Sequence, residues 1–139
     1  MKPPEEARQE LARQWLAKAE DDWRLCHRLT MNPEFYGEAT AFHAQQAVEK
    51  YLKAFPTWHQ VEFPKTHDIK RLLSLACVCD LSLTEALSDA ADLTAYAVEY
   101  RYPGEYPPVT MEDAVSAVAA ADRVRGHIRK RLSGEEMGG

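Results

Sequence analysis

Apolar side chains recur every three or four positions along most of this chain, which is the spacing of an α-helix with one buried face. No stretch alternates polar and apolar residues, and no Asn-Gly or Asp-Gly hairpin turn occurs. The pattern predicts five helices, with approximate limits at residues 5–30, 38–55, 67–79, 82–100 and 110–132. Because most connections are short, we predict an all-α fold, an antiparallel up-and-down four-helix bundle with one extra short helix at 67–79.

The limits of these helices depend on prolines and on capping residues. The residue before a proline avoids the helical region, so Pro33 and Pro56 are expected to end the first two helices. Thr66 and Thr110 are predicted N-caps, and Ser82-Leu83-Thr84-Glu85 has the pattern of a capping box.

Composition narrows the class of protein. The 139 residues suit one domain, placed at 5–132, with 133–139 as a disordered tail. The net charge of −5 argues against a general nucleic-acid coat or a binder of anionic membranes, but it leaves room for a small basic site. No apolar run approaches the roughly 20 residues of a membrane span, and the first residues do not resemble a signal peptide. The odd number of cysteines, three, suits free thiols in the cytoplasm, and their spacing predicts no metal site.

The segment 41–53 carries the most distinctive polar residues. His43, Gln46, Lys50 and Lys53 lie within roughly 80° of arc around the predicted helix. Lysine supplies positive charge for a phosphate, while histidine and glutamine offer hydrogen bonds to a base or a sugar. A solvated helix face is the alternative explanation of such a stripe.

Two further clusters follow. Lys65 and His67 flank the helix start predicted at Thr66, where free backbone N–H groups attract anions, although a plain cap explains them as well. Arg101 continues an apolar stripe and is expected to point inward, where a guanidinium needs a carboxylate partner. Asp22 and Glu99 are the candidates. Asp22 also interrupts an apolar stripe and is therefore the predicted structural partner of Arg101 at one end of the bundle.

The last predicted helix is basic toward its C-terminus. Cations are favourable at this end of a helix dipole, and a surface role in RNA binding is the alternative. The residues concerned are Arg123, Arg125, Arg129, Lys130 and Arg131.

Taken together, these clusters resemble the HEPN domain, a nucleotide-binding helical family of prokaryotes and higher eukaryotes. The resemblance rests on residues 15–22, 42–54, 65–68 and 101–103, and their order and spacing extend it over about residues 10–132. It implies an up-and-down helical bundle that is usually dimeric. It also implies a minimal nucleotidyltransferase, encoded alongside in toxin–antitoxin style, as a frequent partner.

Many HEPN proteins resemble metal-independent ribonucleases whose motif places a histidine four to six residues after an arginine. Arg101 matches the arginine, but residues 105–107 hold no histidine. We therefore expect a nucleotide- or RNA-binding module to which we assign no catalytic residue and no cofactor. One alternative is a ribonuclease that uses Arg101 with His43 or His67 as acid and base. A second alternative is a non-catalytic interaction scaffold.

The predicted site and assembly follow from this reading. The residues expected to bind nucleotide or phosphate are His43, Gln46, Lys50, Lys53, Lys65, His67 and Arg101. A homodimer is expected through the helix at 82–100 and the loop after it, because several aromatic residues are expected to be exposed there and nearby, namely Trp58, Phe63, Tyr100, Tyr102 and Tyr106.

Overall fold

The computed structural model describes residues 4–96, 104 and 107–133. Its elements are α1 (Pro4–Thr30), α2 (Gly37–Trp58), α3 (Ile69–Cys79), α4 (Leu83–Ala86), the 3-10 helix η1 (Ser88–Tyr96) and α5 (Met111–Ser133). The described residues contain helices and no strand, which confirms the all-α prediction. The expected tail lies almost wholly outside them. No described helix combines the length and the apolar character that a membrane span requires.

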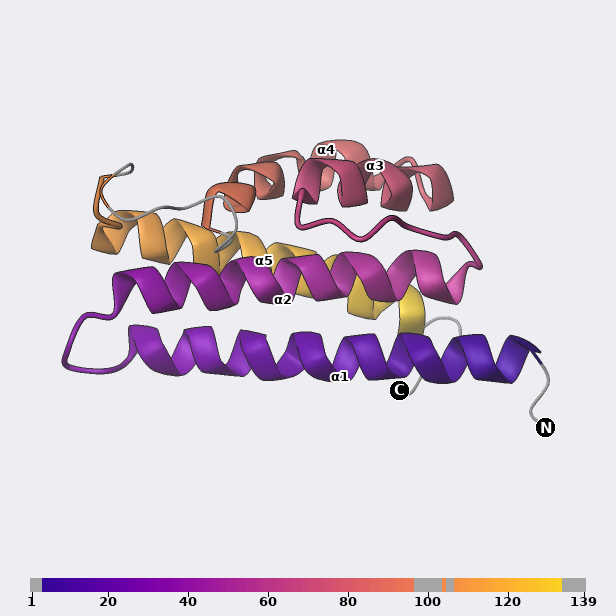
Figure 1. Cartoon of the computed structure of the whole chain (residues 1–139), viewed down its shortest axis with the longest axis horizontal. Coiled ribbons are helices and arrows are strands. Elements are labelled where there is room, and N and C mark those ends of the chain that lie inside the picture. The colour runs from indigo at the N-terminus through magenta and orange to yellow at the C-terminus, as the bar shows by residue number, and fades with distance from the viewer. Residues whose placement is uncertain (1–3, 97–103, 105–106, 134–139) are drawn as a thin grey trace.

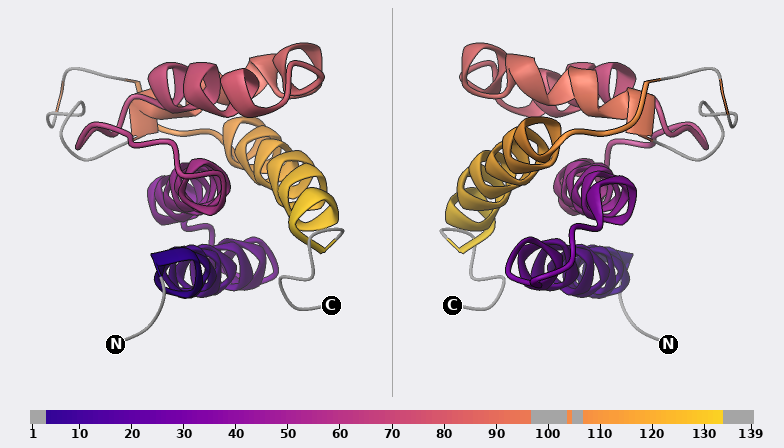
Figure 2. Two further views of the ribbon diagram at one scale, coloured as in Figure 1. Left: turned by 90° about the vertical axis from the view of Figure 1, so that its right-hand side faces the viewer. Right: turned by 90° about the vertical axis from the view of Figure 1, so that its left-hand side faces the viewer.

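The centre of the bundle is α2. It pairs antiparallel with α1 on one side, while α3, η1 and α5 pack on its other sides (Figure 1). The end-on views in Figure 2 show α1, α2 and the α3–η1 layer stacked in that order, with α5 beside α2. Fifteen of the 22 residues of α2 are buried, so this helix has almost no face that is free for solvent.

The core is built from apolar side chains of every helix. The largest that are fully buried are Tyr51, Leu52, Ile69, Leu72, Leu83, Leu87, Ile128 and Leu132. Along α3 and α5 these side chains are three or four residues apart, which is the helical repeat from which the sequence pattern located the two helices.

The end of α2 corrects one prediction. Pro56 does not stop the helix at Phe55, because α2 continues to Trp58 with Pro56 inside it. Pro56 has no N–H group to donate, yet Phe55, Pro56 and Trp58 are all buried, and the burial of these rings offsets the missing hydrogen bond. Trp58, expected to be exposed, is only 6% exposed.

The prediction of one continuous helix at 82–100 is also corrected. It is replaced by the single turn α4 and then by η1, and residues 97–100 lie outside the described part of the chain. A 3-10 helix has three residues per turn, which brings Leu87, Ala90 and Leu93 onto one face. All three side chains are buried. A continuous α-helix would instead spread these three side chains over about 120° of arc.

Of the three predicted helix N-caps, the structure confirms one and corrects two. Thr110 is a cap as predicted: its Oγ1 accepts from the backbone N–H of Asp113 at 3.0 Å, and its own N–H donates to Asp113 Oδ2. The third helix begins at Ile69, two residues later than expected, and Asp68 rather than Thr66 caps it by accepting from the N–H of Lys70. Ser82 forms no cap, because its hydroxyl donates to Asp80 at 2.6 Å.

Candidate functional site between helices α1 and α2

Asp22 on α1 joins two of the predicted site residues on α2. Its Oδ1 lies 2.9 Å from His43 Nδ1, and its Oδ2 accepts from Lys50 Nζ at 2.5 Å. The side chains of Asp22, His43 and Lys50 are 13%, 27% and 24% exposed. An ionised carboxylate only accepts hydrogen bonds, so His43 Nδ1 carries a hydrogen, and in the neutral ring Nε2 is the nitrogen left to accept one. We call these three residues the Asp22 cluster.

Glu49 on α2 gathers a second group, the Glu49 cluster. Its side chain is only 2% exposed. Its Oε1 lies 3.0 Å from Lys53 Nζ and 2.6 Å from His67 Nδ1. Its Oε2 accepts from the amide of Gln45 at 2.8 Å and from that of Gln46 at 3.3 Å. The segment between α2 and α3 therefore folds back on α2 through His67.

These contacts decide between the two explanations of the polar stripe on α2. The stripe is half-buried against α1 and the segment after α2, so it is not the solvated face that was the alternative explanation. Asp22 and Glu49 also balance the charges of Lys50 and Lys53, which leaves the two clusters close to neutral when their histidines are neutral. An anion arriving here has to compete with these carboxylates for each lysine.

Two predicted site residues are not part of these clusters. Lys65 is exposed in the segment between α2 and α3, two residues before His67. Arg101 lies outside the described residues, so its predicted pairing with Asp22 stays a prediction. Within the described part of the chain, both carboxylate oxygens of Asp22 are engaged by α2.

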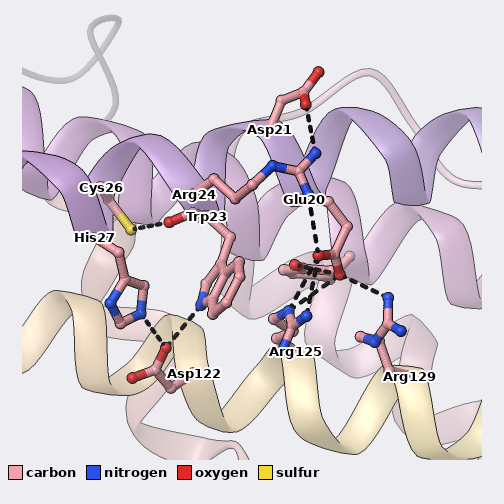
Figure 3. Close-up of polar contacts among 10 residues, drawn as sticks. Glu20, Asp21, Trp23, Arg24, Cys26, His27, Asp122, Arg125 and Arg129 are labelled. Atoms are coloured by element: carbon pink, nitrogen blue, oxygen red, sulfur yellow. Dashed lines mark hydrogen bonds and ion pairs between the residues drawn. The ribbon is translucent and has the colours of Figure 1, made fainter.

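Sequence reasoning missed the buried Glu20, which joins α1, α2 and α5. It is 8% exposed and accepts from Arg125 at 3.1 to 3.2 Å and from Arg129 at 3.0 Å (Figure 3). It also accepts from the Tyr51 hydroxyl at 3.0 Å. Burial by itself raises the pKa of Glu20, but the hydrogen bonds from Arg125 and Tyr51 outweigh it and lower the pKa below its ordinary 4.5. A signal was present in the sequence, because Glu20 interrupts the helical line of Leu16 and Trp23.

Asp122 on α5 makes the neighbouring connection to α1. Trp23 and His27 point from α1 toward it (Figure 3), and their ring nitrogens lie 2.7 and 2.6 Å from its Oδ1. Arg125 also stacks over the ring of Trp23, 3.7 Å from its centroid. Two of the basic residues near the end of the chain, Arg125 and Arg129, thus serve to hold α5 against α1.

The three cysteines form no disulfide, and the one on α1 is buried. Cys26, Cys77 and Cys79 are free thiols, and burial, with the nearby charges of Asp122 and Asp22, raises the pKa of Cys26 to about 12. A thiol with so high a pKa is a poor nucleophile at neutral pH. The described residues include no group of three or more histidine, cysteine or acidic side chains placed to hold a metal ion.

The fold and the site define a class of small all-helical domain, in which the central helix carries a polar seam. The seam consists of the Asp22 cluster, against α1, and of the Glu49 cluster, against the segment after α2. The family model of the HEPN domain matches residues 12–131, most of the chain and both clusters of the seam. The chain belongs to the HEPN domain family, and the resemblance noted in its motifs is confirmed. Neither the curated proteins nor the solved structures contain a significant match. Membership supports a function related to nucleotides or RNA in general.

Proposed function

We propose that this chain is a nucleotide- or RNA-binding module without efficient catalysis. The observation that carries the proposal is the Asp22 cluster, in which one carboxylate holds both a histidine and a lysine at a half-buried seam. His43 Nε2 can accept a hydrogen bond from a sugar hydroxyl or a base. Lys50 can exchange Asp22 for a phosphate oxygen, and Gln46, one turn away on α2, offers further hydrogen bonds.

The competition between Asp22 and phosphate makes a sharp test possible. Binding of a labelled short RNA and of a labelled mononucleotide is measured by fluorescence anisotropy at low and at moderate salt. Lys50→Ala should weaken binding by about tenfold, which corresponds to the loss of one charge-assisted hydrogen bond. Asp22→Asn keeps the shape but removes the competing negative charge, so it should strengthen binding.

Arg28→Ala is the matched control, because Arg28 is exposed on α1, six residues after Asp22 and about 120° around the helix from it. It changes the net charge as Lys50→Ala does. Urea unfolding of each variant separates a loss of binding from a loss of fold. The proposal is wrong if the native protein binds neither ligand at low salt, or if Lys50→Ala and Asp22→Asn bind as the native protein does.

A second candidate function is ribonuclease activity, and the contact between Asp22 and His43 favours it. The 2.9 Å contact between Asp22 and His43 Nδ1 orients the ring as a carboxylate orients the base of a hydrolase. The motif histidine after Arg101 is absent, however, and general acid–base catalysis contributes about 10²–10⁴-fold. We therefore expect no turnover of labelled RNA in the presence of a chelator. Robust cleavage that His43→Ala abolishes would establish the ribonuclease instead.

We further propose that the module is a homodimer and that a minimal nucleotidyltransferase is its partner, in a toxin–antitoxin-like pair. The support is the resemblance in motifs described above. Light scattering at micromolar concentration should give twice the 15.8 kDa of one chain. A monomeric mass contradicts the dimer, and a neighbouring gene that encodes no nucleotidyltransferase contradicts the partner.

A further inference from the structure

A groove of about 770 Å³ runs along α5. Arg123, Gly126, His127 and Lys130 line it from α5 at positions i, i+3, i+4 and i+7, which is one face of a helix. Asp80, at the end of α3, lies at its rim. Neither the family match nor the proposed function uses any of these residues.

The hydrogen bonds around His127 determine which of its two ring nitrogens carries the hydrogen in the neutral ring. Arg131 Nη1 lies 3.2 Å from His127 Nδ1, and a guanidinium can only donate. Nδ1 is therefore the acceptor, and the hydrogen of the neutral ring is on Nε2. Arg131 is itself held in place by Asp80 at 2.6 Å and by Ser82 at 2.8 Å. His127 thus offers a fixed N–H donor in the groove.

The other lining residues leave space and positive charge beside this donor. Gly126 forms part of the wall, and a Cβ atom added there would meet nothing within 4 Å. Lys130 is exposed and makes no hydrogen bond or ion pair with the residues that the structure describes. A ligand can therefore approach the backbone of α5 at Gly126 between the His127 ring and the Lys130 ammonium.

The two carboxylates of the groove are already satisfied. Asp80 accepts from Arg131 and from Ser82, and Asp122 from the rings of Trp23 and His27 on α1. Arg123 pairs with Asp89 outside the groove lining. Arg131 is thus paired with Asp80 and Arg123 with Asp89, which leaves Lys130 as the cation in the groove lining without a carboxylate partner among the described residues.

We propose that this groove binds a phosphate group, which accepts from Lys130 Nζ and His127 Nε2 above Gly126. The ligand chemistry is a phosphate monoester or diester, supplied either by a free mononucleotide or by a nucleic-acid strand. An ammonium and a neutral N–H donor at the protein surface give weak, salt-dependent binding, with a dissociation constant in the millimolar range.

The test is a titration of the labelled protein with inorganic phosphate, with AMP and with a short single-stranded RNA, followed through the backbone amide signals in ¹H–¹⁵N spectra. Saturable shifts are expected at residues 126–130. Shifts with phosphate and AMP identify a free phosphate group as sufficient. Shifts with RNA alone identify the strand backbone as the ligand. In both cases added salt should weaken the binding.

Two variants and one control make the outcome specific. Lys130→Glu should weaken binding at least fivefold, whereas Lys18→Glu makes the same change in net charge on α1 and should leave it intact. Gly126→Leu fills the groove without a clash at Cβ, so binding should be lost from a protein that is folded. The proposal is overturned if no ligand shifts residues 126–130, or if the native protein, Lys130→Glu and Gly126→Leu respond alike.

The same spectra keep this inference separate from the proposed function. Signals of His43 and Lys50 report the seam, and signals of Gly126 and His127 report the groove. Shifts in the groove alone support the groove and contradict binding at the seam. Shifts at the seam alone do the reverse.

Discussion

Three nearly buried carboxylates organise the polar residues of this protein. Glu20, Asp22 and Glu49 lie at junctions between elements, and each meets at least two donors. A carboxylate taken out of water without such partners would cost several kcal/mol, so their positions and those of their cations depend on one another.

Among single residues, Glu20 gives the clearest prediction. Glu20→Ala removes the shared acceptor of Arg125, Arg129 and the buried Tyr51 hydroxyl (Figure 3). The free energy of unfolding should fall by about 2–4 kcal/mol, because these groups stay partly buried without it. Urea denaturation measures this change.

Asp21→Ala is the control for Glu20→Ala. Asp21 pairs with Arg24 at the surface, where the two side chains are 77% and 56% exposed. Its loss should change the free energy of unfolding by less than about 0.5 kcal/mol. Equal effects of the two substitutions would contradict the role given to Glu20.

The lowered pKa of Asp80 leads us to predict that the stability of the fold depends on pH. Hydrogen bonds from Ser82 and Arg131 lower the pKa of Asp80 from its ordinary 3.8 to about 2. A lowered carboxyl pKa stabilises the fold above the unfolded value, and this contribution is lost as the pH falls toward 2. In urea titrations the native protein should exceed Asp80→Asn in stability at pH 5, and the difference should shrink as the pH falls through this window. A difference that is constant with pH would contradict the prediction.

Among the elements, helix limits set by local hydrogen bonds agree best with the sequence. The start of α5 depends on Thr110 and Asp113, three residues apart, and it lies where expected. The end of α2 and the form of η1 depend on burial instead. Pro56 and Leu93 take part in the core, and their local preferences do not decide the conformation.

The cap of α5 can be tested by itself. Thr110→Ala removes the side-chain acceptor for the N–H of Asp113 and should lower the free energy of unfolding by about 1 kcal/mol. Thr110→Ser keeps the hydroxyl and should restore most of the loss. The measurement is urea unfolding, and an alanine variant as stable as the serine variant would show that the cap contributes nothing.

The whole molecule is held together by α2, on which α1, α3, η1 and α5 all pack. The contacts of α2 with α1 and with α5 are the most extensive between any two described elements, so loosening α2 exposes much of the core. We expect the described bundle to unfold as one cooperative unit.

Leu52→Ala tests this cooperativity. Leu52 is fully buried on α2, and its truncation should lower the free energy of unfolding by about 2–5 kcal/mol. Far-ultraviolet circular dichroism and the fluorescence of Trp15, Trp23 and Trp58 should still follow one transition, at several protein concentrations. Transitions that separate between the two probes would show that α1 or α5 unfolds independently.

The sequence by itself determined the helical class, the positions of α1, α2 and α5, the cap at Thr110 and the family resemblance. These features depend on spacing within one helix or on contacts between residues a few positions apart. His43, Gln46, Lys50 and Lys53 could be grouped for the same reason, since one helical turn brings them together.

Only the tertiary structure decided which partners these residues meet. The contact of Lys50 with Asp22 and that of His67 with Glu49 join different elements, and the convergence of Arg125 and Arg129 on Glu20 joins α5 to α1. Helical periodicity gives the face on which a side chain lies, but not how far a neighbouring helix is shifted or rotated against it. The same applies to η1, because both 3.0 and 3.6 residues per turn bring apolar side chains of this segment to one side, and packing against α2 and α3 selects the tighter helix.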